Sequence, residues 1–334
     1  MMKTLEDGDA DLGHLNDKTV AIIGYGNQGR AQALNLRDSG VRVIIGSIRD
    51  AGADEAARDG FSVVPIAAAA EQAGLLALLI PDEVQRDVYQ QEIAPRLRAG
   101  QVLDFAHGYN IHFGLIRPPA DVDVIMVAPR MIGITVRKSF EQGRGVPAYV
   151  AVAQDASGSA RDIALAWAKG IGATRAGVLE TTFAQETELD LFAEQGVWPI
   201  IMRDLLLSYE VLVEAGFPPE MVALELYGSG EAGEIFAQMA KEGIINQMRL
   251  HSHTSQYGTL SRGPRMLPEE TRQRLRDALA GIRSGKFAAE WTEEQAAGYP
   301  NFERLRSEAR RHPINDAEQL GRAMLRRAGL SDAE

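Results

Sequence analysis

Residues 19–29 read Thr-Val-Ala-Ile-Ile-Gly-Tyr-Gly-Asn-Gln-Gly, and this stretch decides the fold. Its first five residues form an apolar, β-branched run typical of a strand that is buried on both faces. After the glycine-rich part, apolar residues follow at helical spacing up to Gly40, and a second apolar run occupies residues 41–45. Strand, glycine-rich turn, helix and strand together predict a βαβ unit of the kind that binds a dinucleotide.

Each glycine of this turn has its own role. Gly24 permits the tight turn, Gly26 lets the backbone approach a pyrophosphate, and Gly29 lets the helix pack closely on the strand. The first amides of the helix point at the same anion. An ordinary glycine-rich turn is the alternative, but the flanking strand and helix argue against it. We expect the following cofactor-binding residues here: Gly24, Tyr25, Gly26, Asn27, Gln28 and Gly29.

Further apolar runs alternate with short helical segments along the first half of the chain. Three of them end at Pro81-Asp82, at Ala106-His107-Gly108 and at Ala128-Pro129-Arg130. Strands interleaved with helices predict a mostly parallel sheet with helices on both faces. Ligands of such sheets bind beyond the carboxyl ends of the strands, so we expect His107 and Arg130 to lie where a substrate meets the cofactor.

The second strand ends in Gly46-Ser47-Ile48-Arg49-Asp50, without the carboxylate at the strand tip that binds the ribose of NAD. Arg49 can hold a 2′-phosphate, which favours NADPH. Asp50 and Asp54 would repel that phosphate if they faced the ribose, but Asp54 is also a good candidate for the cap of the next helix. NADH therefore stays open as the alternative.

After Glu180 the strand pattern stops and helical periodicity begins. Asp190 and Glu194 are four residues apart and share a helix face, where two carboxylates can hold Mg²⁺. A solvated acidic face is the alternative interpretation. Other acidic residues flank Gly228-Ser229-Gly230, whose closely spaced glycines weaken or break a helix. The hydroxyl-rich turn 252–258 is either a plain loop or the edge of a carboxylate-binding site.

Length and composition limit the classes of function. A chain of 334 residues favours two domains, which we place at 1–182 and 183–334. Acidic residues outnumber basic ones by 46 to 35, which disfavours nucleic acid as a partner. Cysteine is absent, and we find neither a signal peptide nor an apolar stretch long enough for a bilayer. We expect a cytoplasmic protein whose partners are small molecules or copies of itself.

The chain resembles the ketol-acid reductoisomerases of the short form. The resemblance covers nearly the whole chain, and the matching stretches are Ile22–Gly29, Pro81–Gln85, Phe105–Phe113, Gln154–Gly158, Ala168–Gly172, Glu180–Phe183, Asp190–Gln195 and Phe287–Trp291.

This resemblance implies an N-terminal Rossmann domain, an all-helical knotted C-terminal domain, and subunits that pair into a dimer or an assembly of dimers. It also implies NADPH, or less often NADH, with two Mg²⁺ ions, and conversion of an acetohydroxy acid to a dihydroxy acid of branched-chain amino-acid synthesis. The residues that it assigns follow. The cofactor is bound by Pro81, Asp82, Gln85 and His107 besides the glycine turn and Arg49; the metals by Asp190, Glu194, Glu225 and Glu231; the substrate carboxylate by Ser252; and catalysis falls to His107, Arg130 and Glu194.

Three positions depart from the family pattern. Arg130 stands where the family has lysine, and arginine is a poor proton carrier. Two extra residues follow Glu225, so the second glutamate of the pair is Glu231 if the helix bulges at Gly228-Ser229-Gly230. Histidines flank Ser252. These changes indicate either an altered substrate or an ordinary subfamily variant.

Two other functions stay open beside a reductoisomerase. One is a 2-keto acid reductase without isomerase activity, in which Arg130 binds the substrate carboxylate. The other is a non-catalytic protein that senses the cofactor, although such a protein has no use for metal-binding carboxylates beside a nicotinamide.

Overall fold

The computed structural model describes residues 2–329 and separates into two compact units, Met1–Asp190 and Leu191–Glu334. The boundary that the sequence predicts, between residues 182 and 183, lies just before helix α8 (Phe183–Phe192), which crosses from the first unit into the second. Each unit is described by itself below.

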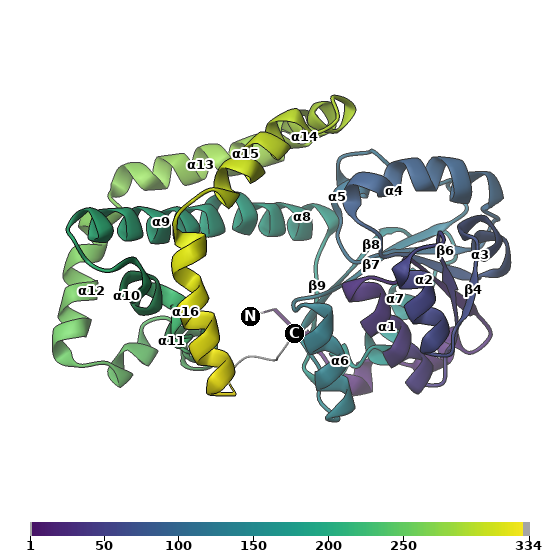
Figure 1. Cartoon of the computed structure of the whole chain (residues 1–334). Coiled ribbons are helices and arrows are strands. Elements are labelled where there is room, and N and C mark those ends of the chain that lie inside the picture. The colour runs from purple at the N-terminus through teal and green to yellow at the C-terminus, as the bar shows by residue number, and fades with distance from the viewer. Residues whose placement is uncertain (1, 330–334) are drawn as a thin grey trace. The chain divides into compact units, whose positions relative to one another are not determined.

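The first unit is built on one mixed sheet with helices on both faces, as the apolar runs predict (Figure 1). The strand order is β1-β9-β8-β7-β6-β5-β2-β3-β4. Neighbouring strands are parallel except at β7·β8 and β1·β9. The strands are β1 (Thr4–Leu5), β2 (Thr19–Ile23), β3 (Arg42–Gly46), β4 (Ser62–Val64), β5 (Leu75–Leu78), β6 (Val102–Phe105), β7 (Asp123–Pro129), β8 (Ala148–Gln154) and β9 (Val178–Glu180).

The helices of this unit connect successive strands. They are α1 (Asn27–Asp38), α2 (Ala51–Arg58), α3 (Ile66–Gln72), α4 (Asp82–Val88), α5 (Tyr109–His112), α6 (Gly133–Glu141) and α7 (Ala160–Gly170), followed by α8. Because β2 lies between β3 and β5, the strand order reverses at β2. The glycine turn after β2 therefore lies at the position where open α/β sheets bind their ligands.

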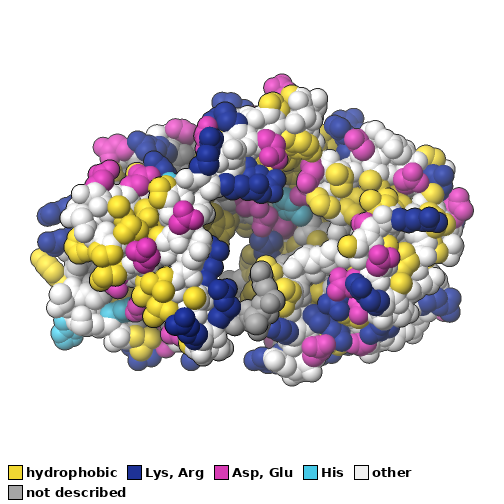
Figure 2. All heavy atoms as spheres, viewed as in Figure 1, with side chains coloured by type: hydrophobic (Ala, Val, Ile, Leu, Met, Phe, Trp, Pro, Cys, Tyr) yellow, Lys and Arg dark blue, Asp and Glu magenta, His cyan; other side chains and the backbone are white. Residues whose placement is uncertain are grey.

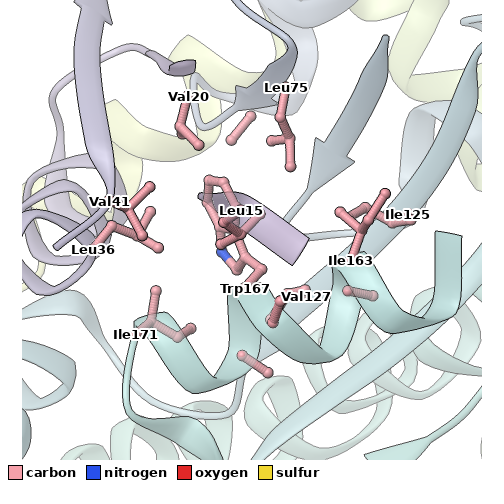
Figure 3. Packing of buried hydrophobic residues seen from close by; sticks show 14 of the residues in the cluster. Leu15, Val20, Leu36, Val41, Leu75, Ile125, Val127, Ile163, Trp167 and Ile171 are labelled. Carbon is pink, nitrogen blue, oxygen red and sulfur yellow. The ribbon is translucent and has the colours of Figure 1, made fainter. Parts of the chain in front are cut away.

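Alternate residues of the central strands feed two separate cores, one on each face of the sheet. Val20 and Ile22 of β2 pack with α1 and α7 on one face, whereas Ala21 and Ile23 pack with α3 on the other. Trp167 of α7 is the largest fully buried side chain and lies at the centre of the first core (Figure 3). The N-terminal unit thus buries its apolar strands on both sides.

Close packing explains two glycines of the turn. Gly24 has φ +91°, a conformation that side chains rarely adopt. A Cβ on Gly29 would lie 2.3 Å from the carbonyl oxygen of Gly24. Only glycine at 29 lets α1 begin this close to the end of β2, and this confirms the role predicted from the sequence.

The second unit is entirely helical. Its elements are α9 (Trp198–Glu214), α10 (Pro219–Ala223), α11 (Glu231–Glu242), α12 (His253–Met266), α13 (Glu269–Arg283), α14 (Lys286–Ala296), α15 (Pro300–Arg310) and α16 (Ile314–Arg327). Two π-helical turns, Ala193–Val197 and Leu224–Gly228, precede α9 and α11. Within residues 2–329, no helix combines the length and the hydropathy needed to span a bilayer.

The buried core of the helical unit is small. It centres on Tyr209, Val222 and Ile314, where α9, α10 and α16 meet. Many large apolar side chains of this unit are instead exposed, and Figure 2 shows several patches of them on its surface.

Candidate active site

A histidine and an aspartate meet where two parallel strands end side by side. Strand β5 pairs with β6, so the residues after each strand emerge at the same edge of the sheet. Asp82 begins α4 after β5, and His107 follows β6. The Nδ1 atom of His107 lies 2.7 Å from Oδ2 of Asp82, which fixes the orientation of the ring. Its Nε2 atom is buried and, among the described residues, has no hydrogen-bond partner.

Helix α8 presents two carboxylates to that ring. Nε2 of His107 lies 3.6 Å from Asp190 Oδ2 and 3.9 Å from Glu186 Oε2. The Glu186 side chain is only 1% exposed and accepts a 2.9 Å hydrogen bond from the amide of Gly108. Glu186 and Asp190 are four residues apart, and this spacing directs both toward the same place.

Arg130 completes the cluster from the end of β7. Its Nη1 donates to Glu186 Oε1 at 3.0 Å and its Nη2 to Asp190 Oδ1 at 2.5 Å. The guanidinium also lies 5.2 Å from the centre of the Tyr149 ring. The planar guanidinium of arginine can donate to two separate carboxylates at once through different nitrogen atoms, whereas lysine has a single nitrogen. His107 and Arg130 therefore lie together at the strand ends, as the sequence predicts.

Burial and charge set the protonation of the cluster. Burial alone lowers the pKa of His107, but the hydrogen bond to Asp82 and the nearby carboxylates outweigh it and raise the pKa to about 9. Burial also raises the pKa of Glu186 above its usual range, against the opposing effect of His107 and Arg130. The raised pKa favours a proton on the histidine while no metal is bound; a nitrogen that holds a proton cannot coordinate a metal, so the two states exclude each other at Nε2.

The cluster has the atoms that a divalent cation needs. One ligand atom from each of His107, Glu186 and Asp190 lies within 4.8 Å of the others. Two of the three are carboxylate oxygens, the ligands that Mg²⁺ prefers. Sequence analysis did not single out Glu186. The signal was present, since residues 186, 190 and 194 form one acidic row at four-residue spacing on a helix.

The backbone of the glycine turn is arranged for an anion, while its side chains point elsewhere. A Cβ on Gly26 would have nothing within 4 Å, so the backbone there is open to a ligand. The Tyr25 hydroxyl donates to Asp59 at 2.8 Å. Gln28 donates to the carbonyl of Met131, and Asn27 accepts from the amide of Gly133.

The loop after β3 carries the residues expected to decide between NADPH and NADH. Arg49 is exposed in the loop after β3. Asp50, not Asp54, caps α2, because its side chain accepts a 2.9 Å bond from the amide of Ala53. The prediction that Asp54 is the cap was wrong by one helical turn. The Asp50 carboxylate is therefore hydrogen-bonded to the first turn of α2.

The predicted residues near Asp82 hold the loop after β5. Pro81 precedes the first turn of α4. The Gln85 amide donates to the carbonyl of Ile80 at 2.9 Å, and Asn110 donates to Gln85 at 3.1 Å. Gln85 therefore joins the loops that carry Asp82 and His107.

The other predicted residues belong to the helical unit. Glu194 lies in the first π-helical turn and Glu225 in the second, whereas Glu231 is the first residue of α11. The π-helical turn at Leu224–Gly228 is a local bulge of the helix, as expected, and the helix then ends at Gly230, which has φ +86°, and restarts at Glu231. Ser252 caps α12, and its hydroxyl accepts from the amide of Ser255 at 3.2 Å.

A dinucleotide-type glycine turn, with His107 and Arg130 at the strand ends facing the carboxylates of helix α8, is typical of one class: oxidoreductases that use a nicotinamide cofactor with a divalent cation. Two family models match the chain, "Acetohydroxy acid isomeroreductase, NADPH-binding domain" over residues 14–177 and "Ketol-acid reductoisomerase, C-terminal domain" over residues 183–327. The chain belongs to the ketol-acid reductoisomerase family.

Individual relatives agree. The chain is 51% identical over 316 residues to the ketol-acid reductoisomerase (NADP(+)) of Pyrobaculum calidifontis, covering 94% of this chain and 96% of the relative. It is 50% identical over 326 residues to the enzyme of that name from Pyrobaculum aerophilum, covering 97% and 98%. The solved structure of an NADH-preferring ketol-acid reductoisomerase from an uncultured archaeon is 41% identical and covers 98% of this chain and 99% of its own, with a TM-score of 0.91. A putative oxidoreductase from Jannaschia, 16% identical over 82% of this chain and 98% of its own with a TM-score of 0.62, shows the fold alone.

Proposed function

We propose that the chain is a ketol-acid reductoisomerase, which converts an acetohydroxy acid to a 2,3-dihydroxy acid by alkyl migration and reduction. The observation that carries this proposal is the cluster of His107, Glu186, Asp190 and Arg130 at the strand ends of a dinucleotide-binding sheet. The family supports it, as do the names of relatives that are about half identical to this chain.

The cofactor site fits a dinucleotide. The first amides of α1, at Asn27, Gln28 and Gly29, have no partner within the helix and would hold the pyrophosphate. NADPH, when bound, supplies the hydride that reduces the rearranged ketone. The exposed Arg49 supports a 2′-phosphate, and the engagement of Asp50 with its own helix supports the same preference.

The acidic cluster fits Mg²⁺. We assign Asp190 as a metal ligand, with Glu194 four residues further along the chain, and Glu225 and Glu231 as candidates from a second copy of the chain. When bound, the cations stabilise negative charge on the two substrate oxygens during the migration. Glu186 is a further candidate ligand, because its carboxylate shares the cluster with Asp190.

The residues of the cluster divide the remaining work. His107 holds a proton on Nε2, next to the carboxylates, and Asp82 keeps it there through Nδ1. Arg130 stays charged and orients Glu186 and Asp190, since a guanidinium does not carry protons at neutral pH. Ser252 would bind the substrate carboxylate by donating its hydroxyl proton, while the hydroxyl oxygen still accepts from the amide of Ser255.

A second copy of the chain is the partner that the helical unit favours. Its exposed apolar residues include Trp198, Val211 and Phe236, and exposed apolar side chains in such number are typical of a protein–protein interface. We propose a homodimer or an assembly of dimers that acts in the cytoplasm. The excess of acidic over basic residues, 46 to 35, argues against nucleic acid as a partner.

The test compares two substrates with the same cofactor and metal. Purified protein with NADPH and Mg²⁺ is given 2-acetolactate in one assay and 3-hydroxy-3-methyl-2-oxobutanoate in the other, and NADPH oxidation is recorded. We expect both to be reduced. Reduction of the second compound alone would replace the proposal with a 2-keto acid reductase, since this ketone needs no migration.

A further inference from the structure

The loop that carries Arg130 receives little support from packing. Residues 130–133 connect β7 to α6, and Met131 and Ile132 are 44% and 62% exposed. Apolar side chains that face solvent do not anchor a loop. The amide of Arg130 donates to the carbonyl of Pro147 at 2.8 Å, which holds the start of the loop, but Met131 and Ile132 beyond it need a further support.

Two side chains of the glycine turn supply that support. Nε2 of Gln28 donates to the carbonyl of Met131 at 2.8 Å, and the amide of Gly133 donates to Oδ1 of Asn27 at 2.5 Å. The two segments also touch directly, because a Cβ on Gly133 would lie 1.9 Å from the carbonyl oxygen of Asn27. The Arg130 loop is thus bound on both sides of Ile132 to the turn after β2.

A chain of hydrogen bonds from the core fixes the orientation of the Gln28 amide. Nε1 of Trp167 donates to Oε1 of Gln32 at 2.9 Å, and Nε2 of Gln32 donates to Oε1 of Gln28 at 3.3 Å. An indole nitrogen can only donate, so Gln32 must accept with its oxygen and donate with its nitrogen. Gln28 must then do the same toward Met131.

The Trp167 end of this series of hydrogen bonds is held rigidly. Trp167 and Gln32 are both fully buried, and the Trp167 ring lies among Leu15, Val127 and Ile163 in the core (Figure 3). Because this buried end of the network is held in place, it limits how the more exposed Gln28 amide can turn. The position of Met131 is therefore set from inside the N-terminal unit and not by the exposed surface of the loop.

We propose that Gln28 is a positioning residue for Arg130: the Trp167–Gln32–Gln28 chain holds the 130–133 loop so that the guanidinium meets Glu186 and Asp190. The turn then has two roles, with its backbone amides directed to the cofactor and its Asn27 and Gln28 side chains serving the acidic cluster. The effect on turnover rests on the proposed function; the effect on the loop does not.

The test removes the amide donor without emptying its place. In Gln28→Met the bond to Met131 is lost, and in Gln28→Glu an acceptor of the same size faces the carbonyl. Gln154→Met is the matched control, since the Gln154 amide also donates to backbone carbonyls, those of Pro119 and Val122, away from the site. Hydrogen exchange measured by mass spectrometry over residues 130–136, the affinity for NADPH and the kinetics on acetolactate are recorded for each.

We expect faster exchange of residues 130–136 in both Gln28 variants, a fall of about tenfold in kcat, and an unchanged KM for NADPH. Gln28→Glu should be at least as impaired as Gln28→Met, although it preserves the size of the side chain. Gln154→Met should behave like the wild type at the site.

Three results would overturn the proposal. The first is that hydrogen exchange over residues 130–136 is unchanged in the Gln28 variants, and the second is that exchange is faster but kcat is unchanged. The third is that NADPH binds more weakly while exchange over residues 130–136 is unchanged, which would make the Gln28 side chain a cofactor ligand. If the wild type does not turn over acetolactate, the proposed function fails, and exchange and NADPH affinity still decide whether Gln28 holds the loop.

Discussion

The two units of the chain bury their apolar residues in different ways. In the N-terminal unit, alternate residues of the central strands enter two cores, and helices cover both faces of the sheet. In the helical unit a small cluster around Tyr209 and Ile314 is buried, while many large apolar side chains face outward (Figure 2). They include Val197, Trp198, Met202, Leu207, Val211, Phe217, Met221, Phe236, Ile244, Ile245, Leu250 and Leu260.

The two units differ in whether a single chain buries their apolar residues. A sheet covered on both faces satisfies its own backbone and core, so the N-terminal unit can hold a buried ionic cluster in place. Exposed apolar helices lower their free energy by association. The first unit is thus organised around a site, and the second presents the apolar surface on which we propose that a second copy binds.

The largest effect tests whether the chemistry depends on the N-terminal cluster. Asp190→Asn keeps the size of the side chain but removes the charge that faces His107 and Arg130. We expect kcat on acetolactate to fall by about 10²–10⁴-fold, because metal stabilisation of the reacting oxygens provides several kcal/mol. The melting temperature should change little, since Asp190 is partly exposed.

Asp121→Asn, an exposed carboxylate in the loop before β7, is the control for this experiment. Normal turnover by Asp190→Asn would remove Asp190 from the metal site. A large drop in melting temperature would instead make it a structural residue.

The next effect tests the self-contained core. Ile22→Ala, at a fully buried position of β2, should lower the free energy of unfolding by about 2–5 kcal/mol, measured by urea denaturation. Ile48→Ala, where the side chain is 68% exposed, should cost about 0.5 kcal/mol or less. Equal losses at the two positions would contradict the description of the N-terminal unit as the part that builds its own core.

The third effect tests the interface of the helical unit. Val211 is 61% exposed on α9, and a charge there should oppose burial against a second copy. We expect Val211→Glu to shift the mass measured by light scattering toward the monomer, with an association constant about tenfold or more weaker. Ile48→Glu places the same charge on an exposed apolar residue of the N-terminal unit and should leave the mass unchanged. Dissociation of both Val211→Glu and Ile48→Glu, or of neither, would contradict the assignment of the interface to the helical unit.

The last effect appears only when the pH is changed. Asp104 of β6 is fully buried, and burial raises its pKa well above the model-compound value of 3.8. Its contribution to stability is complete below pH 3.8 and is lost as the pH rises toward the folded-state pKa, because only the unfolded chain ionises readily there.

Asp104→Asn keeps an oxygen that can accept from the amide of Val127 but cannot ionise. We expect it to match the wild type near pH 4 and to exceed it at pH 8 by about 1.4 kcal/mol for each pKa unit crossed, measured by urea unfolding. Parallel stability curves over this range would show that Asp104 is ionised in the folded protein.

Sequence patterns predicted the parts of the site that depend on strand order. Apolar runs locate β2, β5, β6 and β7, and parallel pairing then brings His107 and Arg130 to one edge of the sheet. The Rossmann unit and the helical second half are confirmed; the knot and the roles of Ser252, Glu225 and Glu231 stay predictions. The short edge strand β1 was not predicted, because two residues carry no periodicity.

Burial and side-chain direction were harder to predict. Glu186 is part of an acidic row that looks solvated in sequence, yet tertiary packing buries it against Gly108. Asp50 and Asp54 are both suitable caps one turn apart, and only the path of the preceding loop decides between them. Near Gly230 the expected bulge is present as a π-helical turn, but the exact residue at which the helix breaks depends on the left-handed backbone of Gly230.

The absence of room at Gly133 matters for anyone who recombines this chain with its relatives. Because helix α6 begins against the carbonyl of Asn27, we expect segments 24–32 and 130–136 to fit together only when both come from the same parent. A chimaera that takes one of them from another parent should keep its fold and lose its catalytic efficiency, whereas a chimaera that exchanges both together should keep both.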